Sequence, residues 1–149
     1  MRNKVNELQV SYIESPQQAN IPKIQSSEDA FEVLYGDWDK NTIALKESFK
    51  ILLLNNANQV KGIYEISQGG ITGTLVDLRI LYAVILKSLS VGIILAHNHP
   101  SGNLNPSLRD KEITNKIREA GQLFDIILLD HLILTPFKSY YSFADEGLL

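Results

Sequence analysis

The stretch AHNHPSGNLNPSLRD, residues 96–110, joins an apolar segment to two closely spaced histidines and a loop rich in Pro, Gly and Asn. The segment before it, VGIILA (91–96), predicts a short buried strand. The chain has only three histidines in 149 residues, and His97 and His99 are two of them. In an extended segment, residues two apart point to the same side with Cα atoms roughly 6.5–7 Å apart, so both rings can reach one ion. An HxH pair alone is weak evidence for a metal site, because exposed histidines at strand ends are more common.

The loop leads into a helix that we expect to continue to about Ala120. Two starts fit the sequence. Ser107 and Asp110 have the spacing of a capping box, in which each side chain bonds the other residue's backbone N–H. Alternatively, Asn105-Pro106 supplies the N-cap and the first helical residue, which leaves the Asp110 carboxylate free for other work. The two roles can coexist, because one carboxylate oxygen can bind an ion while the other accepts a hydrogen bond.

Two imidazoles and one carboxylate form a ligand set of the right hardness for Zn²⁺: His97, His99 and Asp110. A catalytic zinc has three protein ligands and a fourth position for water, whose pKa it lowers from about 15.7 to about 7. The chain contains no cysteine, so disulfides are excluded and a metal site must use His, Asp or Glu. Such a site also requires a carboxylate near the water as general base.

The composition is that of an ordinary globular domain, with 44% hydrophobic and 21% charged residues. The net charge of -3 argues against broad binding to nucleic acid. DNA binding would need a local basic patch, for which Lys111, Lys116 and Arg118 are candidates, but these equally fit a solvated helix face. The first residues lack the apolar region of a signal peptide, and Lys87 interrupts the most apolar tract, 80–96. We therefore expect a cytoplasmic protein with no membrane span.

Hydrophobic periodicity predicts one mixed domain in the order α-β-β-β-α-β-α-β. We expect residues 1–25 to form an N-terminal extension, with VSYIES (10–15) as a candidate edge strand, and residues 26–149 to form the domain. The expected elements are a helix from Ser26-Ser27 to near Gly36, hairpin strands at 46–54 and 59–67, a third strand at 71–77, a helix at 78–89, strands at 91–96 and 125–134, a helix closed by Gly121, and a short strand in the tail.

His97-Asn98-His99, followed after seven residues by Ser107 and after two more by Asp110, resembles the JAMM motif of the JAB/MPN metalloprotease superfamily. The fuller string HNHPSG…PS..D resembles its RadC branch, and the resemblance covers approximately residues 30–149. It implies an α/β (α+β) fold in which helices flank a curved mixed β-sheet, the JAB/MPN (cytidine deaminase-like) architecture. Zinc would lie at the end of a central strand. Three further segments carry the resemblance: LLLNNANQVKG, DHLIL and YYSFADEGLL.

The resemblance also implies roles for individual residues. The implied ligands of one zinc per chain are His97, His99 and Asp110. Ser107 matches the serine that assists the tetrahedral intermediate. A glutamate on an earlier strand acts as general base on the zinc-activated water, and Glu47, at the entry to the strand 46–54, matches it best. Glu65 in the second hairpin strand is the alternative, although its alternation with Tyr64 and Ile66 favours a solvated strand position.

The activity implied by the resemblance is zinc-dependent hydrolysis of peptide or isopeptide bonds in an unidentified peptide or protein substrate. Two alternatives stay open: a RadC-type accessory protein in DNA repair or DNA processing, and a module that binds an extended peptide without cutting it. Full-length RadC proteins carry an N-terminal helix-hairpin-helix region that is associated with DNA binding. Residues 1–30 show neither the Gly-centred hairpin nor the basic content of such a region.

Other polar and aromatic residues are expected to have structural roles. Ser101 lies in a Pro-Ser-Gly turn that needs no catalytic explanation. His131 opens an apolar strand, and we expect a backbone or carboxylate hydrogen-bond partner for it rather than a metal. Trp38, Tyr140 and Tyr141 are expected in core or edge packing.

Overall fold

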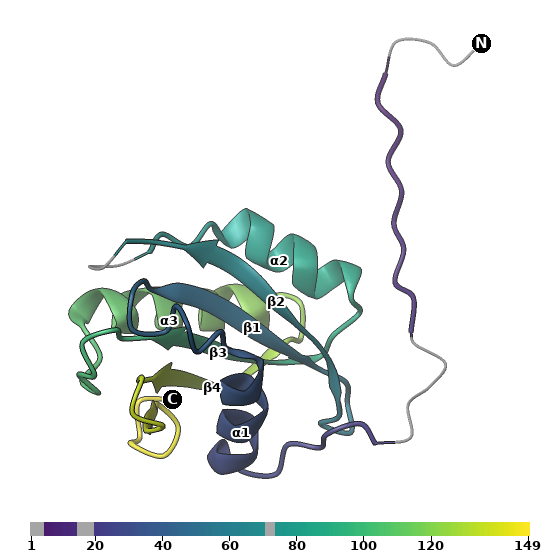
Figure 1. Ribbon diagram of the computed structural model, residues 1–149. Helices are drawn as coiled ribbons and strands as arrows, with labels where there is room; N and C mark the ends of the chain where they lie inside the picture. The colour runs from purple at the N-terminus through teal and green to yellow at the C-terminus, as the bar shows by residue number, and fades with distance from the viewer. Residues whose placement is uncertain (1–4, 15–19, 71–73) are drawn as a thin grey trace.

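The computed structural model describes residues 5–14, 20–70 and 74–149 and contains one five-stranded sheet with helices on both faces (Figure 1). The strand order is β2-β1-β3-β4-β5; β3 and β4 run parallel, and the other neighbours are antiparallel. The mixed α+β class is confirmed. The elements are α1 (Ser27–Asp37), β1 (Ser48–Leu54), β2 (Val60–Gln68), α2 (Leu78–Lys87), β3 (Gly92–Asn98), α3 (Leu108–Gln122), β4 (Ile127–Leu134) and β5 (Tyr140–Ser142).

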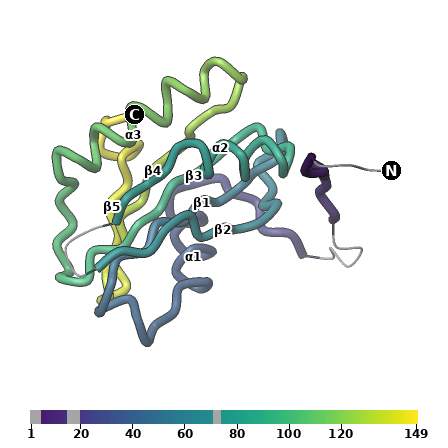
Figure 2. The backbone as a smooth tube through the Cα atoms, turned by 90° about the horizontal axis from the view of Figure 1, so that it is seen from above, coloured from purple at the N-terminus to yellow at the C-terminus, as the bar shows by residue number. Residues whose placement is uncertain are grey.

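The two central strands, β1 and β3, are buried along their whole length because helices cover both faces of the sheet. Alternate residues of each strand enter different halves of the core, as the pleat requires. Ile94 and Ala96 pack on the α1 side, whereas Ile93 and Leu95 pack with residues of α2 and α3. Figures 1 and 2 show α1 on one side of the sheet and α2 and α3 on the other. His97 follows this alternation onto the α2–α3 side, and Asn98 onto the α1 side.

Most predicted elements are confirmed, but the order is α-β-β-α-β-α-β-β because the strand expected at 71–77 is not observed. Residues 71–73 lie outside the described part, and residues 74–77 have no strand structure. The short strand expected in the tail is β5. The candidate edge strand at 10–15 is also wrong within 10–14, which carry no strand, while residue 15 is not described. The division of the chain at residue 25 stays a prediction.

Helix α3 extends two residues beyond its predicted end at Ala120, to Gln122, and Gly121 lies inside it rather than after it. A Cβ on Gly121 would stand 2.7 Å from the carbonyl oxygen of Ile126, which follows the turn into β4. The glycine therefore permits a close backbone approach and does not act as a helix cap. Helix α2, in contrast, ends at Lys87 and not at the predicted residue 89, so Leu89 lies outside the helix and is exposed.

The predicted packing of the aromatic residues agrees with the structure. Trp38 is buried in the core beside α1, and the ring of Tyr140 stacks on Phe31 at 4.5 Å between centroids. Tyr141 contacts Phe143 edge to face. None of the helices in the described ranges is long and apolar enough to cross a membrane.

Candidate metal centre

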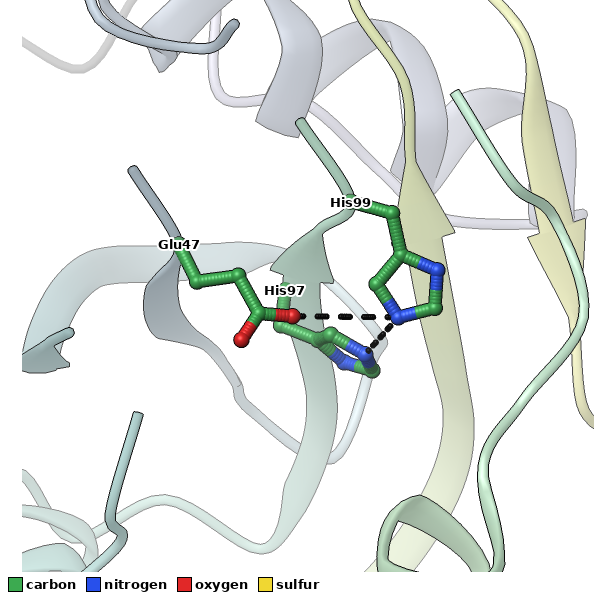
Figure 3. A group of neighbouring side chains, drawn as sticks. All are labelled: Glu47, His97 and His99. Carbon is green, nitrogen blue, oxygen red and sulfur yellow. Dashed lines mark hydrogen bonds and ion pairs between the residues drawn. The ribbon is translucent and has the colours of Figure 1, made fainter. Parts of the chain in front are cut away.

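The end of β3 and the segment just before β1 bring three polar side chains together on the α2–α3 side of the sheet. Figure 3 shows Glu47, His97 and His99 pointing toward one another. The antiparallel register pairs Phe49 with His97, so its continuation places Glu47 opposite His99. Because these positions have the same parity, their side chains leave the sheet on the same side. The Nε2 atoms of the two histidines are 3.0 Å apart.

A buried chain of hydrogen bonds determines which ring nitrogen of His97 carries its proton. The Thr114 hydroxyl lies 2.6 Å from the carbonyl oxygen of Asp110, which can only accept, so Thr114 donates there. Its remaining role is to accept from Nδ1 of His131, also at 2.6 Å. The Nε2 atom of His131 then accepts from Nδ1 of His97 at 2.7 Å. In the neutral rings, Nε2 of His97 is left as a lone pair directed at the cluster.

A second acceptor determines the proton position in His99. Its Nδ1 atom lies 2.6 Å from the carbonyl oxygen of Asn103, so Nδ1 donates and Nε2 of His99 also presents a lone pair. Neither Nε2 atom can then donate to the other across their 3.0 Å separation. Two lone pairs that face each other at this distance repel unless a cation lies between them. The donor set therefore fits a metal ion.

The Asp110 carboxylate completes a triangle with the two histidines. Its Oδ2 atom lies 3.4 Å from Nε2 of His97 and 3.5 Å from Nε2 of His99. Ligand atoms bound about 2.0–2.1 Å from a tetrahedral zinc are about 3.3 Å from one another. The three separations are close to this value. The Oε1 atom of Glu47 is 3.8 Å from Nε2 of His99, longer than a tetrahedral edge, although Glu47 and the two histidines also form a compact ligand group.

Asp110 and Ser107 cap α3 and face the cluster at the same time. Ser107 is the N-cap with a complete capping box, so the alternative start at Asn105 is wrong. One and the same oxygen of Asp110 takes part in the capping box and faces the histidines. Its Oδ2 atom accepts from the backbone N–H of Ser107 at 2.9 Å and is the atom that faces both histidines. The Ser107 hydroxyl accepts from the Asp110 amide at 3.0 Å, which leaves its own proton available to the cleft.

The structure brings Glu47, and not Glu65, to the cluster. Glu65 is exposed on β2, where its carboxylate accepts a hydrogen bond from the side chain of Gln68. Glu47 is partly buried, and burial raises the pKa of its carboxyl group, while the nearby His97 and His99 act in the opposite direction. A carboxyl group with a raised pKa is a better proton acceptor than an ordinary one.

The pKa values of Asp110 and His99 are shifted in opposite directions. Burial acts to raise the pKa of Asp110, but the two facing histidines, which in their protonated form donate to its carboxylate, outweigh burial and hold that pKa below its ordinary value. Burial acts to lower the pKa of His99, but Asp110, the Asn103 carbonyl and Glu47 together raise it. Asp110 is therefore ionised at neutral pH, as a metal ligand must be.

Comparisons with known proteins identify the family of this chain. The family model of the RadC-like JAB domain matches residues 24–148. The chain belongs to the RadC-like JAB domain family. It is similar to a UPF0758 protein of Flavobacterium johnsoniae, with 47% identity over 131 residues, which are 86% of this chain and 54% of the relative. UPF0758 proteins of Porphyromonas gingivalis and Symbiobacterium thermophilum are 40% and 41% identical over 70% and 69% of this chain. The chain spans about half the length of these curated relatives.

In this JAB domain the cluster lies in a cleft of about 610 Å³. Residues 74–76 line the cleft together with the loop after His99 and the first half of α3. Phe49, Val76 and Ile113 contribute apolar surface, and Arg109 and Lys116 contribute positive charge. The volume is typical of a ligand site with a few convergent polar groups. Lys111, Lys116 and Arg118 are all exposed on α3, as a solvated helix face would be.

Three residues outside the candidate ligand set support the site of this JAB domain, and no sequence pattern predicts their roles. The ring of His131 bonds His97 and Thr114 instead of the expected backbone or carboxylate partner. Thr114, a buried threonine on α3, had no signal of its own beyond its position one helical turn after Asp110. Asn98, between the two histidines of the candidate metal site, is fully buried on the opposite face of β3. Ser101 accepts a bond from the Asn103 amide, the turn role predicted for it.

Proposed function

We propose that this JAB domain is a zinc-dependent hydrolase of peptide or isopeptide bonds, with His97, His99 and Asp110 as the ligands. The observation that carries the proposal is the convergence of two Nε2 lone pairs and one carboxylate oxygen at separations of 3.0, 3.4 and 3.5 Å. Glu47 stands beside this triangle, 3.8 Å from His99, where a general base would be needed.

A bound zinc would supply an activated water and an electrophile for the substrate carbonyl. The residues of the chain provide the rest. Glu47 accepts the proton of the attacking water and passes it to the leaving amine, which its raised pKa favours. The Ser107 hydroxyl, which donates to no described group, donates to the oxyanion that develops on the carbonyl. The cleft beside the cluster accommodates an extended peptide substrate.

The first test is the metal content of untagged protein, measured by elemental analysis and compared with His97→Ala/His99→Ala. We expect about one zinc per chain in the parental protein and none in the double variant. The second test screens peptide and isopeptide substrates by mass spectrometry. The matched control is Glu47→Gln, which keeps the zinc stoichiometry and lowers hydrolysis at least about 100-fold. A chain that takes up no zinc at neutral pH would overturn the proposal, and a zinc-loaded chain that binds peptides without cleaving them would reduce it to a binding module.

A further inference from the structure

We propose that Asn98, the residue between the two ligand histidines, is a positioning residue that fixes the backbone of Glu47 and thereby holds its carboxylate beside the cluster. This inference rests on the proposed role of Glu47. Asn98 has a fully buried side chain, and it leaves β3 on the α1 side, opposite to the histidines. It can therefore act on Glu47 without touching a ligand.

All three hydrogen bonds of the Asn98 side chain go to backbone groups around Glu47. Its Oδ1 atom accepts from the amide of Ser48 at 2.8 Å, and its Nδ2 atom donates to the carbonyl of Lys46 at 2.9 Å. The second Nδ2 proton goes to the carbonyl of Ile43 at 2.8 Å, in the turn that leads from α1 to β1. The bonded groups of Lys46 and Ser48 belong to the two peptide units that meet at Glu47.

The other half of each peptide unit is bonded on the opposite side. The Glu47 amide donates to the carbonyl of Gly70 at 3.2 Å, and the Glu47 carbonyl accepts from the amide of Gly69 at 2.9 Å. Both peptide planes next to the Cα atom of Glu47 are therefore held at both edges, by Asn98 on one side and by Gly69 and Gly70 on the other. This arrangement determines φ and ψ of Glu47 and with them the direction of its Cα–Cβ bond, from which the carboxylate extends toward the cluster (Figure 3).

Asparagine is the side chain that fits these three bonds. It offers one acceptor and two donors on a short stem, which is the set that one N–H and two C=O groups require. Aspartate keeps the acceptor but loses both donors and places a charge against two carbonyl oxygens. Serine is too short to span the same groups. The identity of residue 98 is thus explained by the backbone around Glu47 and not by the metal cluster.

The test is a double-mutant cycle on zinc affinity, measured by competition with a chromogenic chelator, in the four chains with and without Asn98→Ser and Glu47→Gln. If Asn98 acts through the Glu47 carboxylate, Asn98→Ser weakens zinc binding about threefold to tenfold in the parental chain but less than about twofold beside Glu47→Gln. Ser88→Ala, which removes a buried hydroxyl between α2 and β3, is the matched control and leaves the affinity unchanged. Equal losses in both backgrounds, or no loss in either, would overturn the inference.

Two metal-free measurements separate this inference from the proposed function. In the parental chain the Ser48 amide exchanges slowly with solvent, and Asn98→Ser accelerates that exchange more than it accelerates exchange in the rest of β1. The NMR signals of the His99 ring shift in Asn98→Ser as they do in Glu47→Gln, with no further shift in the double variant. Unchanged exchange at Ser48 or additive shifts at His99 would overturn the positioning role even in a chain that binds zinc. Asn98→Asp, which keeps the bond to Ser48, gives an intermediate effect on exchange and covers the case in which the serine variant does not fold.

Discussion

The two ends of β3 are equally buried but are held in place by different forces. From Gly92 to Ala96 the strand is apolar and packs into both halves of the core. His97 and Asn98 are also buried, yet they depend on a network of hydrogen bonds. Within the described ranges, every fully buried side-chain nitrogen or oxygen has a hydrogen-bond partner. Burial of a polar group is costly unless it is bonded, so the polar end is held in a defined geometry while the apolar end supplies most of the stability.

The largest effect on stability is expected from truncation at the apolar end. Ile93 has no exposed surface, and Ile93→Ala should lower the free energy of unfolding by about 2–5 kcal/mol through lost burial and a residual cavity. Urea unfolding measures this loss. The folded variant should still bind one zinc per chain, because the polar end lies at the other end of the strand. A variant that stays stable but loses its zinc would contradict this separation of the two ends.

The apolar end is also the part of the strand that the sequence predicts well. The run VGIILA is short, continuous and bounded by polar residues, and burial on both faces of a sheet requires such a run. The same reasoning identifies β1 and β4. It fails for the strand expected at 71–77, whose described residues, 74–77, form no strand. Periodicity indicates which face of a segment is apolar. A strand also needs a neighbouring strand with free backbone groups to pair with, and the sequence of the segment does not specify that neighbour.

At the polar end, a change at Thr114 should affect the metal site more than the fold. Thr114→Val keeps the side-chain shape but removes the acceptor for Nδ1 of His131. His131 then gains by donating through Nε2 to His97, which places the proton of His97 on the nitrogen that faces the cluster. We expect zinc affinity to fall about 10–100-fold, or about 1.4–2.7 kcal/mol.

Chelator competition measures the effect of Thr114→Val, with Ser88→Ala as the control for loss of a buried hydroxyl. Ser88 bonds Ile85 and Ser90 at the far end of β3 and should leave zinc affinity unchanged. If Thr114→Val binds zinc as tightly as the parental chain, the proposed hydrogen-bond chain does not set the proton position of His97.

This network explains why the site could be predicted only in part. The spacing of His97, His99 and Asp110 is a local pattern, and the structure brings all three together. Their supporting residues have no such pattern. Thr114 and His131 are 17 positions apart, and Asn98 bonds groups 50 to 55 positions away. Which ring nitrogen of His97 carries the proton depends on the carbonyl oxygen of Asp110, at the end of the hydrogen-bond chain through Thr114 and His131. Only the folded structure brings these groups together.

The polar end should also make stability depend on pH. Burial holds the pKa of His131 well below its ordinary value of 6.5 in the folded chain, so His131 takes up a proton mainly in the unfolded chain. Its contribution to stability is present above pH 6.5 and is lost as pH falls toward the folded pKa, at up to about 1.4 kcal/mol per pH unit. The raised pKa of His99 acts in the opposite sense, because its contribution is lost as pH rises.

A comparison with His131→Gln isolates this dependence. Urea unfolding of the metal-free chains between about pH 7.5 and about pH 5.5 should show a shallower loss of stability in the variant than in the parental chain on acidification. The Ser88→Ala control should keep the parental slope while its stability is lower at every pH. If the stability of the parental chain and that of His131→Gln fall in parallel on acidification, His131 is not the source of the pH dependence.

The smallest effect is expected in the loop that extends the polar end beyond His99. Gly102 has a φ of +84°, and a Cβ there would stand 2.5 Å from the ring of Phe137. Phe137 is 77% exposed, so its ring can move aside, and the main cost of Gly102→Ala is the left-handed backbone, about 1 kcal/mol. Adding Phe137→Ala to Gly102→Ala should therefore not relieve the loss of about 1 kcal/mol, because that loss comes from the backbone and not from contact with the ring. Zinc affinity should change less than about threefold, because two hydrogen bonds hold His99 in place. Its ring donates to the carbonyl of Asn103, and its backbone amide donates to the carbonyl of Leu134. A larger loss of affinity would show that the loop conformation, as well as the buried network, keeps the second histidine in place.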